Sequence, residues 1–173
     1  LKDWARTYCR LIRALADEFG EEEVLDIAEN VWWDMAYEVG KGWREKFERN
    51  PQAALKEKAH SWHDDPMWAR ICCCDVPVLE DNRWELIAVK CYREVFREMN
   101  EPKMGISWCM TDFAAVRGWS PRIVMRQPKN MLRGENYCHQ IRGITDDPSL
   151  QWDYSKETSE KVGWRSIKKL EEA

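Results

Sequence analysis

The spacing of apolar residues changes along this chain from the period of a helix to the period of a strand, which limits the folds it can adopt. From Trp4 to Phe19 the apolar residues recur at intervals of three and four and Gly20 follows, so we predict a first helix that ends there. Residues 21–49 carry apolar side chains on two sides of a second helical pattern, with glycines between residues 39 and 43. We expect this helix to be packed on two sides and to bend or break at the glycines.

After a short helix that begins at residue 51, the pattern becomes that of β-strands. Two runs rich in β-forming residues, 68–79 and 84–91, are separated by turn-forming residues and predict a β-hairpin. Further strands are predicted at 122–127 and 130–142, and helical patterns lie between the two hairpins. Strands joined by tight turns imply an antiparallel sheet of about four strands with helices on one side, which is an α+β fold.

Length and composition are those of one globular domain. The chain has 173 residues, of which 44% are hydrophobic and 34% charged, so it has enough apolar material for one core. We expect a single domain over residues 1–173, with a helical part at 1–66, a sheet with central helices at 67–143, and a tail at 144–173 that includes a helix. The 11 tryptophans are several times ordinary usage, so they predict an aromatic-rich core or a flat apolar pocket.

Charge and hydropathy exclude several classes of protein. The formal net charge is −4 and the basic residues are scattered among acids, so we do not expect the basic surface of a nucleic-acid-binding protein. No stretch approaches the roughly 18 apolar residues of a membrane-spanning helix. The seven cysteines are an odd number without CxxC spacing, and there is no signal-peptide pattern. We therefore expect free thiols in a reducing cytoplasm and no structural zinc finger.

Four motifs occur in a characteristic order over residues 84–142. They are a strand that ends in Cys91, a helix with Cys109-x-x-Asp112, a Gly118-Trp119-Ser120-Pro121 turn into a strand, and a Gly134-Glu135-x-x-Cys138 hairpin. This succession resembles the L-2-amino-thiazoline-4-carboxylic acid hydrolase family, and its closing hairpin is similar to that of 4-vinyl-reductase-type small-molecule-binding domains. The chain departs from the family pattern at Cys91-Tyr92-Arg93, where many members have Cys-Pro-Phe, and at His139, where an acidic or aromatic residue is common.

The resemblance implies an enzyme that opens a small sulfur- or nitrogen-containing heterocycle bearing a carboxylate by hydrolysis. Cys109 and Asp112 are expected on adjoining parts of one helix face, where Asp112 orients a water or accepts a proton from Cys109. In one mechanism the Cys109 thiolate attacks an amidine-like carbon to form a covalent intermediate, with Cys138 as a further catalytic thiol. In the alternative, Cys91, Cys109 and Cys138 hold a zinc or other divalent ion that activates water. Either Asp112 or His139 would complete that ligand set.

The last predicted strand indicates how a substrate is bound. Cys138, Gln140 and Arg142 share one face and His139 lies on the other, so whichever face points into the cavity supplies the contacts. Gln140 and Arg142 suit a carboxylate, because a guanidinium binds one through parallel hydrogen bonds. The candidate substrate-binding residues are Trp108, Arg126, His139, Gln140 and Arg142.

Three consecutive cysteines fall in the first predicted strand. Alternation there separates Cys73 from Cys72 and Cys74, so three adjacent thiols on an extended strand cannot all bind one metal ion. We interpret them as packing residues, with either Cys73 or its two neighbours on the wall of the same pocket as Cys138.

A second hypothesis, from another functional class, is a binding or sensor domain whose aromatic pocket holds a small ligand without turnover. A third, a purely structural helix-interaction protein, accounts for the two-sided helix but leaves the Cys/Asp motif unexplained. A pocket that encloses Cys109 and Asp112 with room for water favours the enzyme, whereas a dry pocket with Asp112 tied to an arginine favours binding. The expected partner is a small molecule, not nucleic acid or a membrane, and a homo-oligomer is compatible with the sequence.

Overall fold

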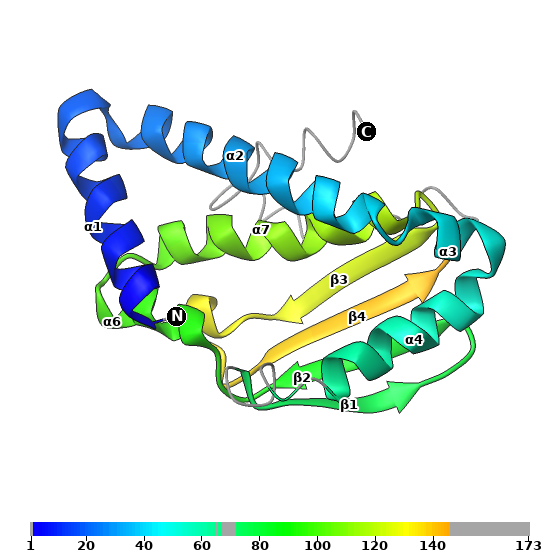
Figure 1. Ribbon diagram of the computed structural model, residues 1–173. Coiled ribbons are helices and arrows are strands. Elements are labelled where there is room, and N and C mark those ends of the chain that lie inside the picture. The colour runs from blue at the N-terminus through cyan, green and yellow to red at the C-terminus, as the bar shows by residue number, and fades with distance from the viewer. Residues whose placement is uncertain (1, 65, 67–71, 146–173) are drawn as a thin grey trace.

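The α+β prediction is confirmed by the computed structural model, which describes residues 2–64, 66 and 72–145 (Figure 1). The helix predicted in the tail lies outside the described residues. Within the described ranges, no helix combines the length and the apolar character needed to cross a membrane.

The sheet formed by the described residues has four strands in the order β1-β2-β4-β3, and every neighbouring pair is antiparallel. The strands are β1 (Cys74–Leu79), β2 (Arg83–Ala88), β3 (Ile123–Lys129) and β4 (Cys138–Ile144). Both predicted hairpins are present as strand pairs, because β1 pairs with β2 and β3 pairs with β4. The pairing of β2 with β4 joins the two hairpins at the centre of the sheet.

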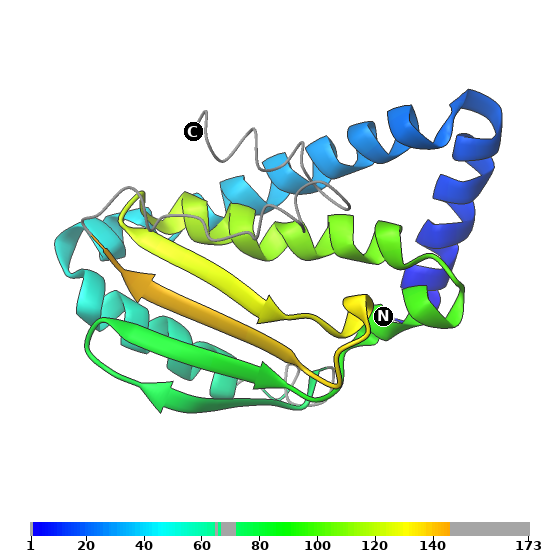
Figure 2. The ribbon, with the colours of Figure 1, turned by 180° about the vertical axis from the view of Figure 1, so that it is seen from behind.

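The described helices lie on one face of this sheet, as predicted. They are α1 (Lys2–Phe19), α2 (Glu21–Lys41), α3 (Arg44–Arg49), α4 (Pro51–His63), the 3₁₀ helix η1 (Tyr92–Glu94), α6 (Val95–Glu98), α7 (Pro102–Trp119) and the 3₁₀ helix η2 (Met131–Arg133). Figure 1 shows α2 running alongside α7, with α4 beside β1 and β2, and these elements are in contact. Figure 2, seen from behind, shows the opposite sheet face with none of the described helices over it. The core therefore forms between the helices and the covered face.

The second hairpin differs from the prediction between its two strands. The expected strand over 130–142 is wrong for its first part, which forms η2 and a turn before β4 begins. The side chain of Asn130 caps η2 by accepting the backbone N–H of Leu132 at 2.9 Å, and this local hydrogen bond competes with strand pairing. Gly134, with φ of 101°, then ends η2 in a conformation that favours glycine.

The first strand begins later than predicted. It starts at Cys74, because Cys73 has φ of 41° in the left-handed region and so cannot continue an extended strand. The prediction that all three consecutive cysteines lie in a strand is therefore wrong for Cys72 and Cys73. The left-handed residue still leaves Cys73 exposed while Cys72 is buried.

The predicted break after the second helix is confirmed, and the glycine before it has a further role. α2 ends at Lys41, and α3 begins after a short turn at Gly42. A Cβ atom at Gly40 would overlap the carbonyl oxygen of Ala115 on α7, and one at Gly118 would overlap the carbonyl oxygen of Tyr37 on α2. These two glycines allow the backbones of α2 and α7 to approach closely.

The prediction that the second helix is packed on two sides is wrong within the described residues. One side of α2 packs on α7, while four residues spaced four apart on another side are between 50% and 70% exposed: Ile27, Val31, Met35 and Val39. The reason is that α1 diverges from α2 after Gly20 (Figure 1), so it buries that side only near Val24 and Ala28. The homo-oligomer considered from the sequence stays a prediction.

Candidate functional site

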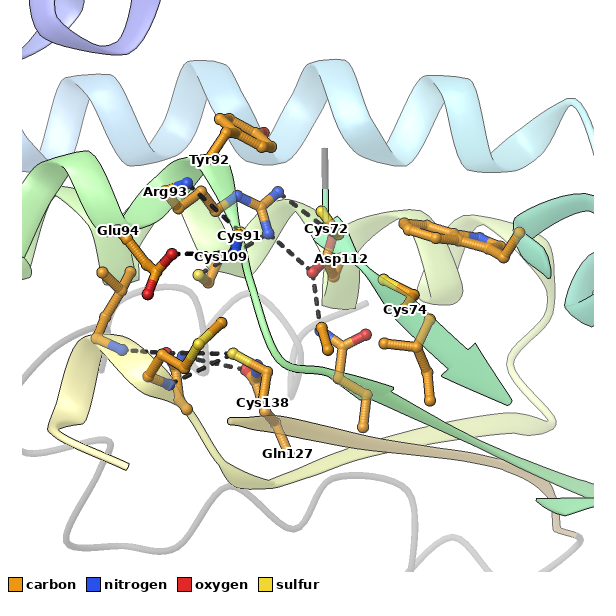
Figure 3. A pocket seen from close by; sticks show the side chains of 17 residues that line it. Cys72, Cys74, Cys91, Tyr92, Arg93, Glu94, Cys109, Asp112, Gln127 and Cys138 are labelled. Carbon is orange, nitrogen blue, oxygen red and sulfur yellow. Dashed lines mark hydrogen bonds and ion pairs between the residues drawn. The ribbon is translucent and has the colours of Figure 1, made fainter. Parts of the chain in front are cut away.

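A small pocket of about 40 Å³ with a thiol-rich wall lies between η1, α7, η2 and the covered face of the sheet (Figure 3). It has room for a few water molecules. All seven cysteines of the chain are free thiols. Five of them line this pocket: Cys72, Cys74, Cys91, Cys109 and Cys138.

A buried carboxylate, Asp112, is held in the pocket by an ion pair and an amide. Arg93 Nη1 donates to Asp112 Oδ2 at 3.1 Å and Arg93 Nη2 donates to Oδ1 at 3.5 Å, while Gln140 Nε2 donates to Oδ2 at 2.9 Å. Only 13% and 14% of the Arg93 and Asp112 side chains is exposed. Burial raises the pKa of Asp112, but Arg93, Arg142 and the Gln140 hydrogen bond outweigh it, so the pKa is lower than usual. Asp112 is therefore ionised at neutral pH.

Cys109 lies one turn before Asp112 on α7 and shares its arginine. Arg93 Nη1 donates to Cys109 Sγ at 3.9 Å. Burial raises the pKa of Cys109 to about 11, with Asp112 adding to the rise and Arg93 opposing it. At neutral pH, Cys109 is consequently a neutral thiol and not a thiolate.

Asn130 links Cys109 to the second candidate catalytic thiol, Cys138. Asn130 is fully buried, its Oδ1 accepts a hydrogen bond from Cys138 Sγ at 4.0 Å, and its side chain also interacts with Cys109, where it lowers the pKa of the thiol. Cys138 Sγ accepts the N–H of Met131 at 3.4 Å. Burial raises the pKa of Cys138 to about 12, so this thiol is protonated as well.

The remaining three thiols of the pocket contact one another beside η1. Cys91 Sγ accepts the backbone N–H of Arg93 at 3.5 Å, and Glu94 Oε2 accepts the N–H of Cys91 at 3.3 Å, so the two residues cap η1. Cys72 interacts with the side chains of Cys74 and Cys91, which act on its pKa in opposite directions. The interaction with Cys74 is the largest cause of the rise of the Cys72 pKa to about 12. The expectation that two of the three consecutive cysteines line the Cys138 pocket is confirmed for Cys72 and Cys74.

The proposed metal ligands do not converge in this arrangement. Over the described ranges, no three or more His, Cys, Asp or Glu side chains are grouped so as to hold a metal ion. Cys91, Cys109 and Cys138 line one pocket, but they do not fit a preformed zinc site, which needs three or four ligands within about 2.3 Å of one point. Metal-activated water stays a prediction from the sequence.

Two of the candidate substrate-binding residues face the pocket side of the sheet. Gln140 lines the pocket, and Arg142 lies behind it, 1% exposed, with Nη2 donating to Gln140 Oε1 at 2.7 Å. The guanidinium carbon of Arg142 lies 4.5 Å from the ring centroid of Trp84 and 5.9 Å from that of Trp62. Its Nε and Nη1 have no hydrogen-bond partner in the described structure. Burial lowers the pKa of Arg142 to about 10, but the group keeps its charge at neutral pH.

The other three candidates are not brought to the pocket. His139 projects from the opposite face of β4, where Nε2 lies 2.6 Å from Glu85 Oε2, and Arg126 lies beside a separate surface depression with Ile141. Trp108 packs in an aromatic cluster, 4.6 Å from the ring centroid of Trp4 and 4.8 Å from that of Trp32. None of the three is among the residues that line the pocket.

Sequence reasoning missed Arg93 and Asn130, which organise this pocket. Arg93 stands at the position where the chain departs from the family's Cys-Pro-Phe pattern, and that departure was the available signal. Asn130 gave a signal of another kind, because asparagine before a short helix is a common cap. Neither signal revealed that both side chains contact Cys109.

The pocket thiols make the free energy of unfolding decrease as the pH rises in the alkaline range. Their pKa values are raised by folding, to about 11 for Cys109 and about 12 for Cys138 and Cys72, so their contribution is fully present below the thiol pKa of the unfolded chain, about 8.5. It is lost as the pH rises through the folded values. We expect the free energy of unfolding in urea to fall between pH 9 and 11, and to fall less in Cys109→Ser. Equal slopes for the two proteins would contradict the assignment to this thiol.

Comparisons with known proteins agree with the resemblance noted from the motifs. A family model described as L-2-amino-thiazoline-4-carboxylic acid hydrolase matches residues 4–141. No curated protein matches the chain. Among solved structures, it is similar to the phenol-responsive sensory domain of the transcription activator PoxR with phenol, at 14% identity over 86% of this chain and 76% of that one, with a TM-score of 0.49. It is also similar to a trafficking protein particle complex subunit 3 from Naegleria fowleri covalently bound to palmitic acid, at 12% identity over 84% of this chain and 95% of that one, with a TM-score of 0.49. On the family match, which spans most of its length, the chain belongs to the L-2-amino-thiazoline-4-carboxylic acid hydrolase family.

Proposed function

We propose that this protein hydrolyses a small sulfur- and nitrogen-containing heterocycle that carries a carboxylate, of the 2-aminothiazoline-carboxylate kind. The observation that carries the proposal is that Cys109 and the ionised Asp112 lie in one enclosed pocket with room for water and share the guanidinium of Arg93. A nucleophilic sulfur next to a fixed carboxylate is what two-step hydrolysis of an amidine-like carbon requires. Membership in the family supports the same reaction class.

The neutral state of Cys109 suits a concerted first step. The Cys109 sulfur bonds to the ring carbon between sulfur and nitrogen, and its proton passes to the ring sulfur as the carbon–sulfur bond of the ring breaks. Water, oriented by Asp112, then adds to the same carbon, and the Cys109 sulfur leaves and regains a proton. The net reaction consumes one water molecule for each ring that is opened. Cys138, connected to Cys109 through Asn130, is the second thiol in contact with the reacting region.

Arg142 and Gln140 are the residues that we propose for the substrate carboxylate. A cation that is 1% exposed and keeps two donor nitrogens unpartnered in the described structure is costly to bury, and an anionic ligand would offset that cost. Gln140 connects this cation to Asp112, so a bound carboxylate would be oriented relative to the reacting carbon. Arg126, His139 and Trp108, which lie elsewhere, are not part of the proposed contact.

The experiment is hydrolysis of 2-aminothiazoline-4-carboxylate, followed by mass spectrometry so that protein thiols do not interfere. We expect turnover by the wild type, a decrease in kcat of roughly 10- to 100-fold in Asp112→Asn, and a raised KM in Arg142→Gln. Arg126→Gln, the same substitution on the opposite sheet face, is the matched control and should leave KM unchanged. Absence of turnover by the wild type, or wild-type kinetics in both pocket variants, would reject the proposal.

A non-catalytic binding domain is the second candidate, and a specific observation favours it. Asp112 is tied to Arg93, and the pKa values of the pocket thiols are raised, which is the arrangement expected of a stable ligand pocket. Calorimetric binding of the same heterocycle without any product would support this function over hydrolysis. Zinc content measured after purification without chelator tests the metal alternative. In both cases we propose a small-molecule partner and a cytoplasmic location.

A further inference from the structure

One nitrogen of Arg93 contacts both candidate reacting groups. Nη1 lies 3.1 Å from Asp112 Oδ2 and 3.9 Å from Cys109 Sγ, and it donates to both (Figure 3). Arg93 comes from η1, whereas Asp112 and Cys109 lie one helical turn apart on α7. The carboxylate and the sulfur therefore compete for one cation.

At present the carboxylate has the larger share of that cation. The second nitrogen, Nη2, also donates to Asp112, so both ends of the guanidinium serve the carboxylate and only one reaches the sulfur. The charged or titratable groups that act on the pKa of Cys109 are Arg93, Asp112 and Cys91, and the side chain of Asn130 also acts on it. Tyr92, Glu94 and Cys138 are further titratable groups that line the pocket. Arg93 is the one cation in this set.

We propose that Arg93 is a positioning residue that determines whether Cys109 is a thiol or a thiolate, and that Asp112 holds Cys109 in the thiol state by occupying Arg93. This inference rests on the proposed function, because it concerns the nucleophile of that reaction. When the negative charge of Asp112 is removed or engaged by a ligand, Arg93 loses the carboxylate to which both of its terminal nitrogens donate, and its charge stabilises the Cys109 thiolate. The site thus keeps Cys109 protonated, and less reactive than a thiolate, for as long as the Asp112 carboxylate holds Arg93.

The proposal makes an unusual prediction about Asp112→Asn. This variant should hydrolyse substrate more slowly, because the water-orienting carboxylate is gone, yet its Cys109 should react faster with an alkylating agent. The two effects have opposite signs because they report different groups. A purely structural role for the Arg93–Asp112 pair does not predict this combination.

The test is the rate at which iodoacetamide alkylates Cys109 in the full chain between pH 6 and 10, measured by peptide mass spectrometry. The thiolate sulfur bonds to the reagent carbon and iodide leaves, so the rate follows the thiolate fraction. We expect Asp112→Asn to make alkylation of Cys109 at least about tenfold faster at each pH in this range, as expected when the thiolate fraction rises about tenfold.

A double-mutant cycle assigns the effect to Arg93. Arg93→Gln leaves the Asp112 carboxylate buried without its cation and risks misfolding, so the Arg93→Gln/Asp112→Asn double variant, which has a neutral pair, is the informative protein. The acceleration seen in Asp112→Asn should disappear in this double variant and should persist in Arg93→Lys/Asp112→Asn. Cys9, in another cluster of the core, is the internal control, and its alkylation rate should stay within about twofold of the wild type.

Three outcomes would overturn the proposal. They are an unchanged alkylation rate of Cys109 in Asp112→Asn, an acceleration that survives without Arg93, or an equal acceleration at Cys9, which would indicate general loosening of the structure. Alkylation needs no substrate, so its result is independent of turnover. If alkylation behaves as expected while no heterocycle is hydrolysed, the proposed function fails and the control of Cys109 by Arg93 stands.

Discussion

Cys109→Ala reduces kcat/KM for heterocycle hydrolysis by at least about 10³-fold, to the background rate, if Cys109 is the nucleophile. Cys138 is the other thiol near the reacting region, but it is hydrogen-bonded to Asn130 and Met131 and forms no hydrogen bond with Arg93 in the described site, so we do not expect it to replace Cys109. The substitution removes one buried sulfur, so we expect the free energy of unfolding to fall by only about 1 kcal/mol. Kinetics and urea unfolding of the same preparation measure both effects.

Cys9→Ala is the matched control for this experiment. Cys9 is equally buried, at 1% exposure, but its Sγ contacts Met104 Sδ at 3.7 Å and it does not line the pocket. It should show a similar loss of stability with wild-type kcat/KM. Retention of more than about a tenth of the activity in Cys109→Ala would show that the sulfur is not the nucleophile, and the mechanism would need another one.

Gly40→Ala lowers the free energy of unfolding by about 2 kcal/mol or more, although alanine is the better helix former. The added methyl group would overlap the backbone carbonyl of Ala115, which a side-chain rotation cannot relieve. The α2–α7 crossing must therefore open, and this reduces packing between the helix that carries Cys109 and its main helical neighbour. Chemical denaturation monitored by circular dichroism measures the change.

Gly42→Ala separates this steric effect from the loss of a flexible glycine. A Cβ at Gly42 would lie 3.3 Å from the carbonyl oxygen of Val39, a tight contact within its own turn, and the residue has φ of −59°, which alanine adopts readily. We expect a change of no more than about 0.5 kcal/mol in either direction. Equal destabilisation by the two substitutions would mean that the close approach of α2 and α7 is not what requires Gly40.

The outline of the fold was predictable because its signals are local. The stripe from Trp4 to Phe19, the glycines after residue 39 and the helix from residue 51 each depend on neighbours a few positions away, and all were confirmed. The failure at residues 130–133 is also local, since the Asn130 cap outweighs strand propensity there. The prediction that α2 is packed on two sides failed for another reason. Apolar periodicity shows that a helix face is suited to packing, but it does not show whether a neighbouring element covers that face.

The candidate site also has features that the local sequence predicts and features that only tertiary packing decides. The proximity of Cys109 and Asp112 follows from three-residue spacing on one helix, so it was predictable. Strand alternation placed Gln140 and Arg142 together and opposite His139, but it left open which face is buried. The packing of α4 and α7 on one side of the sheet resolved that choice in favour of Arg142.

By itself, the sequence determined the element types, the α+β class, the family motifs and the Cys109/Asp112 pair, because each depends on residues close together in the chain. Only the tertiary structure decided that five cysteines share one pocket, that Trp108, Arg126 and His139 lie away from it, and that Arg93 binds Asp112. Arg93 reaches Cys109 from 16 positions away because η1 packs against α7, where the Tyr92 ring lies against that of Trp108. Such contacts form only when separate elements bury their apolar faces together, and no local pattern encodes which charged side chains then meet.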